Sequence, residues 1–157
     1  MLQRKQTLFL LLAALCGMLT FLFPVDTFSR GAQVTVFRTY GIFNAQGVPM
    51  ADGTMKVPLA VLLGALSAML VVIALLYCNR PRQLRLARMA ALLLVAVQAA
   101  LFITDNSLRA YLGREGRVEH SYGVSFFLPM VMVLLVMLAA SGIRKDEELV
   151  KGMDRLR

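Results

Sequence analysis

Four long runs without a charged residue constrain this chain more than any other feature. They cover Thr7 to Phe23, Val57 to Tyr77, Met89 to Thr104 and Val124 to Ile143. A hydrocarbon core of roughly 30 Å needs about 20 helical residues, so the second and fourth runs, with 21 and 20 residues, are long enough by themselves. The first and third are extended by flanking Lys and Arg side chains, whose aliphatic stems can lie in lipid. The pattern predicts four membrane-spanning helices.

The composition agrees with a membrane protein. Hydrophobic residues make up 59% of the 157 residues, charged residues make up 17%, and the mean hydropathy is +0.70. Soluble domains are less apolar and more highly charged. We therefore predict one all-α integral membrane domain, residues 1–157, built as a four-transmembrane-helix bundle with spans at 7–23, 57–77, 86–104 and 124–143.

The first run has two alternative interpretations, a signal peptide or a lipoprotein leader that ends at Cys16. Its apolar stretch is longer than the usual signal-peptide core, and no small-x-small cleavage site follows it. Leu15 stands where a lipoprotein leader would have a small residue. We expect the run to be retained as a membrane anchor.

The distribution of Lys and Arg predicts the orientation. The amino terminus, the Cys78 to Arg88 turn and the tail from Arg144 hold 2, 4 and 5 of them, whereas the longer segments 24–56 and 105–123 hold 3 each. Short loops rich in Lys and Arg stay on the cytoplasmic side. Both termini, the turn 78–85 and the tail 144–157 are therefore predicted to be cytoplasmic, and the two longer loops external.

The net charge of +8 raises the question of nucleic acid as a partner. The charges are spread over positions that flank the apolar runs and are not interleaved with aromatic residues, as a nucleic-acid surface would require. Membrane lipids are the expected partner, and nucleic acid is not.

The first external loop has strand character. In the segment QVTVFRTYGIF, residues 33–43, side chains alternate with a period of two and many are β-branched. The turn signals NAQG and ADG follow, with VPM and TMK as a return strand. The sequence predicts a small external β-hairpin.

Small residues mark the expected helix contacts. They recur every fourth position in the second helix at Ala60, Gly64 and Ala68, which allows another helix to approach closely. Gln98, with two hydrogen-bonding ends in the third helix, is expected to bond to a neighbouring helix. The ridge on the second helix packs inside the bundle or, alternatively, forms a seam for self-association.

The cytoplasmic turn carries a basic cluster made of Arg80, Arg82, Arg85 and Arg88. Such a short cluster usually anchors the topology, and a binding site for an acidic lipid is the alternative.

The tail after Ile143 carries both signs of charge and one narrow apolar stripe, formed by Leu149, Met153 and Leu156. This pattern predicts an amphipathic cytoplasmic helix. Mixed charge favours docking on protein, either on the basic turn of the same molecule or on a cytoplasmic partner.

The sequence shows no catalytic, cofactor or metal signature. The four apolar runs contain no ionisable side chain other than cysteine and tyrosine, and the single histidine, His120, has too few partners for a metal site. We expect no enzyme. The alternative is an enzyme that acts on lipids at the outer surface and uses Asp105, Glu115, Glu119 and His120, although their spacing indicates no particular reaction.

Several segments resemble one protein family. They are QRKQTLFLLLAA near the amino terminus, NRPRQLRLARMAALLL, FFLPMVMVLL and the ending IRKDEELVKGMDRLR. The family consists of small inner-membrane proteins of the Bacteroidota that contain domain of unknown function 4293. The resemblance implies a four-helix protein of the bacterial cytoplasmic membrane with no assigned activity, and it brings no catalytic residues.

These features favour a non-enzymatic role. Uncharged spans, small-residue ridges and a patterned tail suggest an accessory or assembly subunit of a bacterial envelope complex, with other membrane-protein subunits as partners. The alternative is a membrane protein that binds or carries a lipid or another small molecule.

Overall fold

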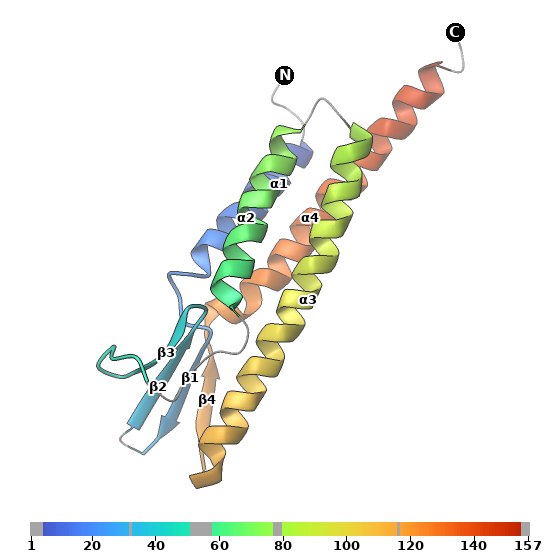
Figure 1. Cartoon of the computed structure of the whole chain (residues 1–157). Coiled ribbons are helices and arrows are strands. Elements are labelled where there is room, and N and C mark those ends of the chain that lie inside the picture. The colour runs from blue at the N-terminus through green and yellow to red at the C-terminus, as the bar shows by residue number, and fades with distance from the viewer. Residues whose placement is uncertain (1–4, 32, 51–57, 77–79, 116, 155–157) are drawn as a thin grey trace.

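The computed structural model describes residues 5–31, 33–50, 58–76, 80–115 and 117–154. In these ranges, helices lie along one another and an antiparallel sheet lies at one end of them (Figure 1). The helices are α1 (Lys5–Leu19), α2 (Leu59–Leu75), α3 (Arg80–Leu112) and α4 (Val124–Asp154), and a 3-10 turn, η1 (Gly113–Glu115), follows α3. The strands are β1 (Asp26–Arg30), β2 (Gln33–Arg38), β3 (Gly41–Asn44) and β4 (Glu119–Tyr122).

The helices bury one apolar stripe each and leave another uncovered. α1 packs against α2 and α4, and α3 packs against the same two helices. Leu10, Leu63, Leu94 and Met132, one from each helix, are completely buried between them. On the outside, large apolar side chains such as Leu92 remain uncovered.

Two of the helices, α3 and α4, are long and apolar enough to cross a membrane. In each, only 28% of the most apolar 18-residue stretch is buried. A core helix of a soluble protein would have most of such a stretch covered. Length, composition and the uncovered apolar surface together are consistent with membrane association.

The predicted four-span topology is wrong, because α1 and α2 are too short. They contain 15 and 17 residues, which extend only about 22 and 26 Å at 1.5 Å per residue. α1 ends at Leu19 although its apolar run continues to Phe23. Pro24 has no N–H to continue the helical bonding to the carbonyl of Thr20, and that carbonyl accepts the hydroxyls of Ser125 at 3.1 Å and Thr39 at 3.5 Å.

The predicted all-α class is also wrong, because the two segments that were predicted to be external loops form a four-stranded antiparallel sheet in the order β3-β2-β1-β4. The predicted hairpin is part of it. Residues 33–43 supply two strands, β2 and β3, and a turn from Asn44 to Gly47 follows, with Gly47 at a φ of 76°. Of the expected return strand, Pro49 makes an isolated bridge to Phe43, and TMK lies outside the described residues.

The two additional strands, β1 and β4, come from parts of the predicted loops in which no strand was expected. β1 pairs with β2 from Asp26↔Phe37 to Arg30↔Gln33, and with β4 from Asp26↔Tyr122 to Ser29↔Glu119. Phe28 and Phe37 point into the core and are nearly or completely buried. The sheet is therefore built from both segments that were predicted to be external loops.

α3 and α4 extend beyond the predicted spans. Residues 105–112, expected in a loop, continue α3 and run beside the sheet. At the other end, α4 continues without interruption through Arg144 to Asp154 and projects past the remaining helices (Figure 1). The tail is thus helical, as predicted, and continues α4, while the side chains of its apolar stripe lie outside the described part of the structure.

Hydrogen bonds and a close backbone contact join the sheet to the helices at the start of α4. The hydroxyl of Ser125 donates to the carbonyl oxygen of Phe23 at 2.8 Å, and the N–H of Gly123 donates to the carbonyl oxygen of Val25 at 2.8 Å. A Cβ at Gly123 would overlap the backbone carbonyl of Pro24. The α1–β1 and β4–α4 connections therefore approach each other more closely than a side chain at position 123 would allow.

Candidate functional site

A buried cluster of titratable side chains lies where the sheet meets α3. It contains Asp26 at the start of β1, His120 on β4 and Asp105 on α3, and we call it the polar junction. Register explains how the two strands bring their residues together. His120 pairs with Phe28, two residues after Asp26 on the same face of the sheet, so His120 and Asp26 are diagonal neighbours.

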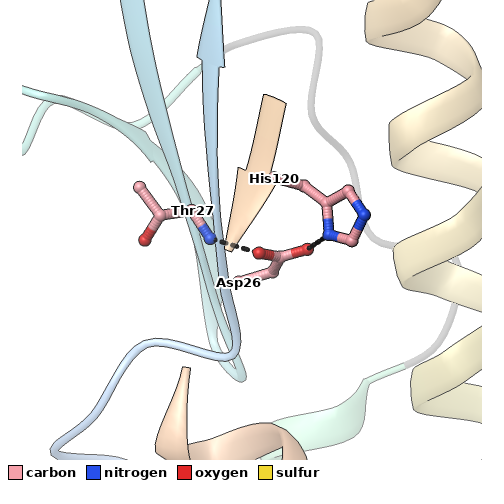
Figure 2. A network of polar contacts seen from close by, with 3 residues as sticks. All are labelled: Asp26, Thr27 and His120. Carbon is pink, nitrogen blue, oxygen red and sulfur yellow. Dashed lines mark hydrogen bonds and ion pairs between the residues drawn. The ribbon is translucent and has the colours of Figure 1, made fainter. Parts of the chain in front are cut away.

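Asp26 is the centre of the polar junction (Figure 2). Its side chain is completely buried. Its Oδ1 accepts the backbone N–H of Thr27 at 2.6 Å, and its Oδ2 lies 3.6 Å from Nδ1 of His120. The second distance is within ion-pair range but is longer than a hydrogen bond. The His120 side chain is 21% exposed, so the imidazole connects the buried carboxylate to the surface.

Asp105 approaches Asp26 from α3. It lies just beyond the uncharged stretch that ends at Thr104, and it is only 2% exposed. Burial raises the pKa of the Asp105 carboxyl to about 7, with further contributions from the charge of Asp26 and from a hydrogen bond to it. Arg109, one helical turn later, acts in the opposite direction.

A shared proton accounts for the contact between the two carboxyl groups. Two ionised carboxylates are both acceptors and cannot hydrogen-bond to each other. Asp26 Oδ2 and Asp105 Oδ1 have no N–H or O–H donor among the described residues. A proton held on Asp105 makes one carboxyl the donor and the other the acceptor.

The chemistry available to the polar junction is proton binding. Carboxyl and imidazole groups are the usual proton carriers near neutral pH. Among the described residues, no three His, Cys, Asp or Glu side chains are placed to hold a metal ion. The polar junction can therefore take up and release a proton while it links β1, β4 and α3.

A pocket of about 360 Å³ lies next to β1 and β2, beside the end of α3. We call it the sheet pocket. Its positive charge comes from Arg30 and Arg114, and its apolar wall includes Phe28, Met50 and Tyr111. Arg30 also donates to Oε1 of Gln33 at 3.2 Å. The combination suits a ligand or partner segment that has an anionic end and an apolar body.

The small-residue positions of α2 lie toward its outer side. Ala60 and Gly64 are partly buried and Ala68 is exposed. A Cβ at Gly64 would touch only Phe21, at 3.8 Å. The buried face of α2 consists instead of larger residues, including Leu59, Leu63, Leu66 and Leu70.

Gln98 lies between α3 and α4. Its Nε2 donates to the backbone carbonyl of Phe126 at 3.3 Å, and its Oε1 has no donor among the described residues.

The basic and tail residues lie at the end of the molecule away from the sheet. Arg80 begins α3, and the side chains of Arg82, Arg85 and Arg88 are exposed on its first turns. Leu149 and Met153 lie on α4, but their side chains are outside the described part of the structure. Leu156 lies outside the described residues altogether. The structure therefore shows no contact between the tail stripe and the basic turn in the part that it describes.

Of the four residues considered from the sequence for an enzyme that acts on lipids, Asp105, Glu115, Glu119 and His120, the fold brings together only two in its described part. Asp105 and His120 both belong to the polar junction, Glu119 is exposed on β4, and the Glu115 side chain is outside the described part. Sequence reasoning missed Asp26, which was not among the candidate residues. The one available signal was an acidic residue next to an apolar run in each of the two segments predicted to be external, and no spacing along the chain related these two residues.

Comparison with known proteins places the chain in a family. No curated protein matches it. A family model described as a domain of unknown function, DUF4293, matches residues 2–156. Since that match covers nearly the whole chain, the protein belongs to the DUF4293 family.

Proposed function

We propose that this protein is an accessory or assembly subunit of a bacterial envelope complex, held in the cytoplasmic membrane by α3 and α4. The positive-inside rule supports an orientation in which Arg80 to Arg88 and the end of α4 face the cytoplasm. In that orientation the sheet, the polar junction and the sheet pocket lie on the opposite side of the membrane.

The sheet pocket is the observation that carries the proposal. Tyr111 is 59% exposed at its edge, and Arg114 is exposed next to it. Arginine and tyrosine are enriched among the residues that dominate binding energy at protein interfaces. Because the sheet is bonded to both connections at the membrane end, the pocket is a rigid feature that a partner segment can enter without large rearrangement.

Site-specific photo-cross-linking in native membranes tests the proposal. A photoreactive amino acid at Tyr111 should give one adduct of defined mass, and wild-type protein purified in mild detergent should retain the same partner at a fixed ratio. Arg114→Glu should reduce the adduct at least fivefold. Asn106 is a matched control position, because it is exposed on α3 near the sheet and does not line the pocket.

Three outcomes would contradict the accessory role. These are no adduct from Tyr111, equal labelling from Tyr111 and Asn106, or an adduct formed only with a second copy of this chain.

A second candidate function is the binding of a small anionic molecule. The sheet pocket favours it, because about 360 Å³ falls within the range of small-molecule sites and two arginines line it. The same purification separates the two candidates. A small molecule that leaves with Arg114→Glu, without a stoichiometric protein partner, supports the second.

A further inference from the structure

A groove between α3 and α4 has both apolar and basic character. It encloses about 470 Å³. Its floor and walls are mostly small or apolar residues, among them Ala91, Met137, Ala140 and Ser141. Arg88 and Arg144 line it as well. This groove is separate from the sheet pocket and from the polar junction.

The two arginines lie at the same end of the groove. Arg88 directly precedes the uncharged run of α3, and Arg144 directly follows the uncharged run of α4. α3 and α4 run in opposite directions side by side (Figure 1), so both arginines mark the boundary where the apolar part of the helix pair ends. In the proposed orientation this is the cytoplasmic surface, where lipid phosphates lie.

The length of the groove corresponds to one leaflet of a membrane. On α4 its lining extends from Val133 to Arg144, which is about 16 Å at 1.5 Å per residue. Half of a hydrocarbon core of roughly 30 Å is about 15 Å. The groove therefore extends along the helices about as far as an acyl chain extends into one leaflet.

Small residues on both helices create the space. Ala91 lies on α3, and Ala140 and Ser141 lie on α4. The hydroxyl of Ser141 donates to the carbonyl of Met137 in its own helix, at 2.9 Å. It therefore needs no polar partner from outside, and the surface it presents to the groove is compatible with a hydrocarbon chain.

We propose that this groove binds an anionic glycerophospholipid of the cytoplasmic leaflet, with one acyl chain between α3 and α4 and the phosphate between Arg88 and Arg144. The positive charges of the two arginines favour an anionic phosphate at their end of the groove. The length of the groove along the helices favours one acyl chain as its apolar occupant. A soluble anion satisfies only the arginines, and an apolar helix satisfies only the groove. Arg144 has a further interaction within the chain, and a guanidinium with five N–H donors can keep it and still bind a phosphate oxygen.

Lipid exchange on the purified full-length protein tests the site. Protein in mild detergent is titrated with phosphatidylglycerol or phosphatidylcholine, and bound lipid is counted by native mass spectrometry. Wild type should hold one phosphatidylglycerol much more tightly than phosphatidylcholine. Arg88→Gln with Arg144→Gln should lower that preference roughly 20- to 30-fold, since each arginine near a membrane surface contributes about a fivefold attraction.

Two matched controls keep the test specific. Arg82→Gln with Arg85→Gln removes the same charge from the same end of α3, but neither residue lines the groove. That variant should keep the preference. Ser141→Leu fills the groove and should abolish tight binding of both lipids, whereas Ser141→Ala keeps the space and should bind as wild type does.

The inference rests on the proposed membrane placement, and the two can fail separately. Release of the protein from membranes by alkaline carbonate would overturn the placement. If the protein stays in the membrane but Arg82→Gln with Arg85→Gln weakens binding as much as the groove pair does, the attraction is a general surface charge and the site is wrong. Complete displacement of the lipid by inorganic phosphate, or no effect of Ser141→Leu, would overturn the acyl-chain contact.

Discussion

At the scale of single residues, the polar junction is the most unusual feature of the protein. Asp26 and Asp105 are acidic groups with almost no contact with solvent, and burying an ionised carboxylate is costly unless it is paired or hydrogen-bonded. A proton on Asp105 removes one of the two charges and supplies the missing donor. The strength of the contact between α3 and the sheet should therefore depend on pH.

The sign of this pH dependence follows from the pKa of Asp105, which is about 7 in the folded protein against an ordinary value of 3.8. The folded state holds the proton more tightly, so the stabilisation is complete near pH 4 and is lost as the pH rises to about 7. We expect the melting temperature in detergent to fall by about 5 °C between pH 5 and pH 8. The Asp105→Asn variant should show no such fall.

The pH experiment is best done in a His120→Gln background, because Nδ1 of His120 lies 3.6 Å from Oδ2 of Asp26. Glu119→Gln is the matched control, since Glu119 is exposed on the same strand as His120. A melting temperature that falls equally with Asp105→Asn would show that another group is responsible.

At the scale of elements, a glycine of α1 lies in close contact with two other helices. Ala13 and Gly17 of α1 are buried, and a Cβ at Gly17 would overlap Oγ of Ser67 on α2 and lie 2.9 Å from Cε of Met132 on α4. α1 therefore fits between its two neighbours only because position 17 has no side chain. Gly64 of α2 lies in a more open place, near the ring of Phe21.

This difference predicts opposite effects of the same substitution in two helices. Gly17→Ala should destabilise the protein by about 1 to 2 kcal/mol, because overpacking outweighs the gain in helix propensity. Gly64→Ala should be neutral or slightly stabilising, since its Cβ would make an ordinary contact. Thermal melts in detergent measure both effects.

Ser67→Ala provides the internal control for the Gly17 contact. Removing Oγ should reduce the cost of Gly17→Ala by at least half, as a double-mutant cycle would show. Equal costs in both backgrounds would mean that Ser67 is not the limiting contact.

At the scale of the whole molecule, the sheet and the basic residues that flank the apolar runs of α3 and α4 lie at opposite ends. The sheet and the polar junction lie at one end of α3, and the arginines of its first turns lie at the other (Figure 1). The end of α4 with Arg144 and Lys145 is on the same side as those arginines. If α3 and α4 cross the membrane, the two ends of the molecule must lie in different compartments.

Cysteine labelling on intact cells tests this polarity. In a background where Cys16 and Cys78 are replaced by Ala, an impermeant thiol reagent should modify a cysteine placed at Val48 or Arg117, both exposed near the sheet. A cysteine at Lys145 should react only after the cells are opened. Labelling of the Lys145 position on intact cells would invert the proposed orientation.

Much of the helical structure was predictable from local sequence, and the sheet was not. Uncharged runs mark α2 and α4 because helical hydrogen bonds close within one turn of the chain, and the alternation from Gln33 onward marks β2 because a strand exposes two faces. β1 and β4 have only 5 and 4 residues, too few for a clear pattern. The residues of β1 and β4 that pair with each other lie about 90 residues apart in the chain, so only the folded molecule brings them together.

The sequence by itself determined the apolar character of the protein, the helical runs and the distribution of basic charge, since each depends on residue type and local order. The tertiary structure decided which apolar runs become long helices. Pro24 and the hydroxyl of Ser125 end α1 early, whereas α3 continues past Asp105 because the sheet lies beside it. It also decided that Asp26, Asp105 and His120 form one buried cluster. Such contacts depend on the relative positions of three separate elements, which no spacing along the chain encodes.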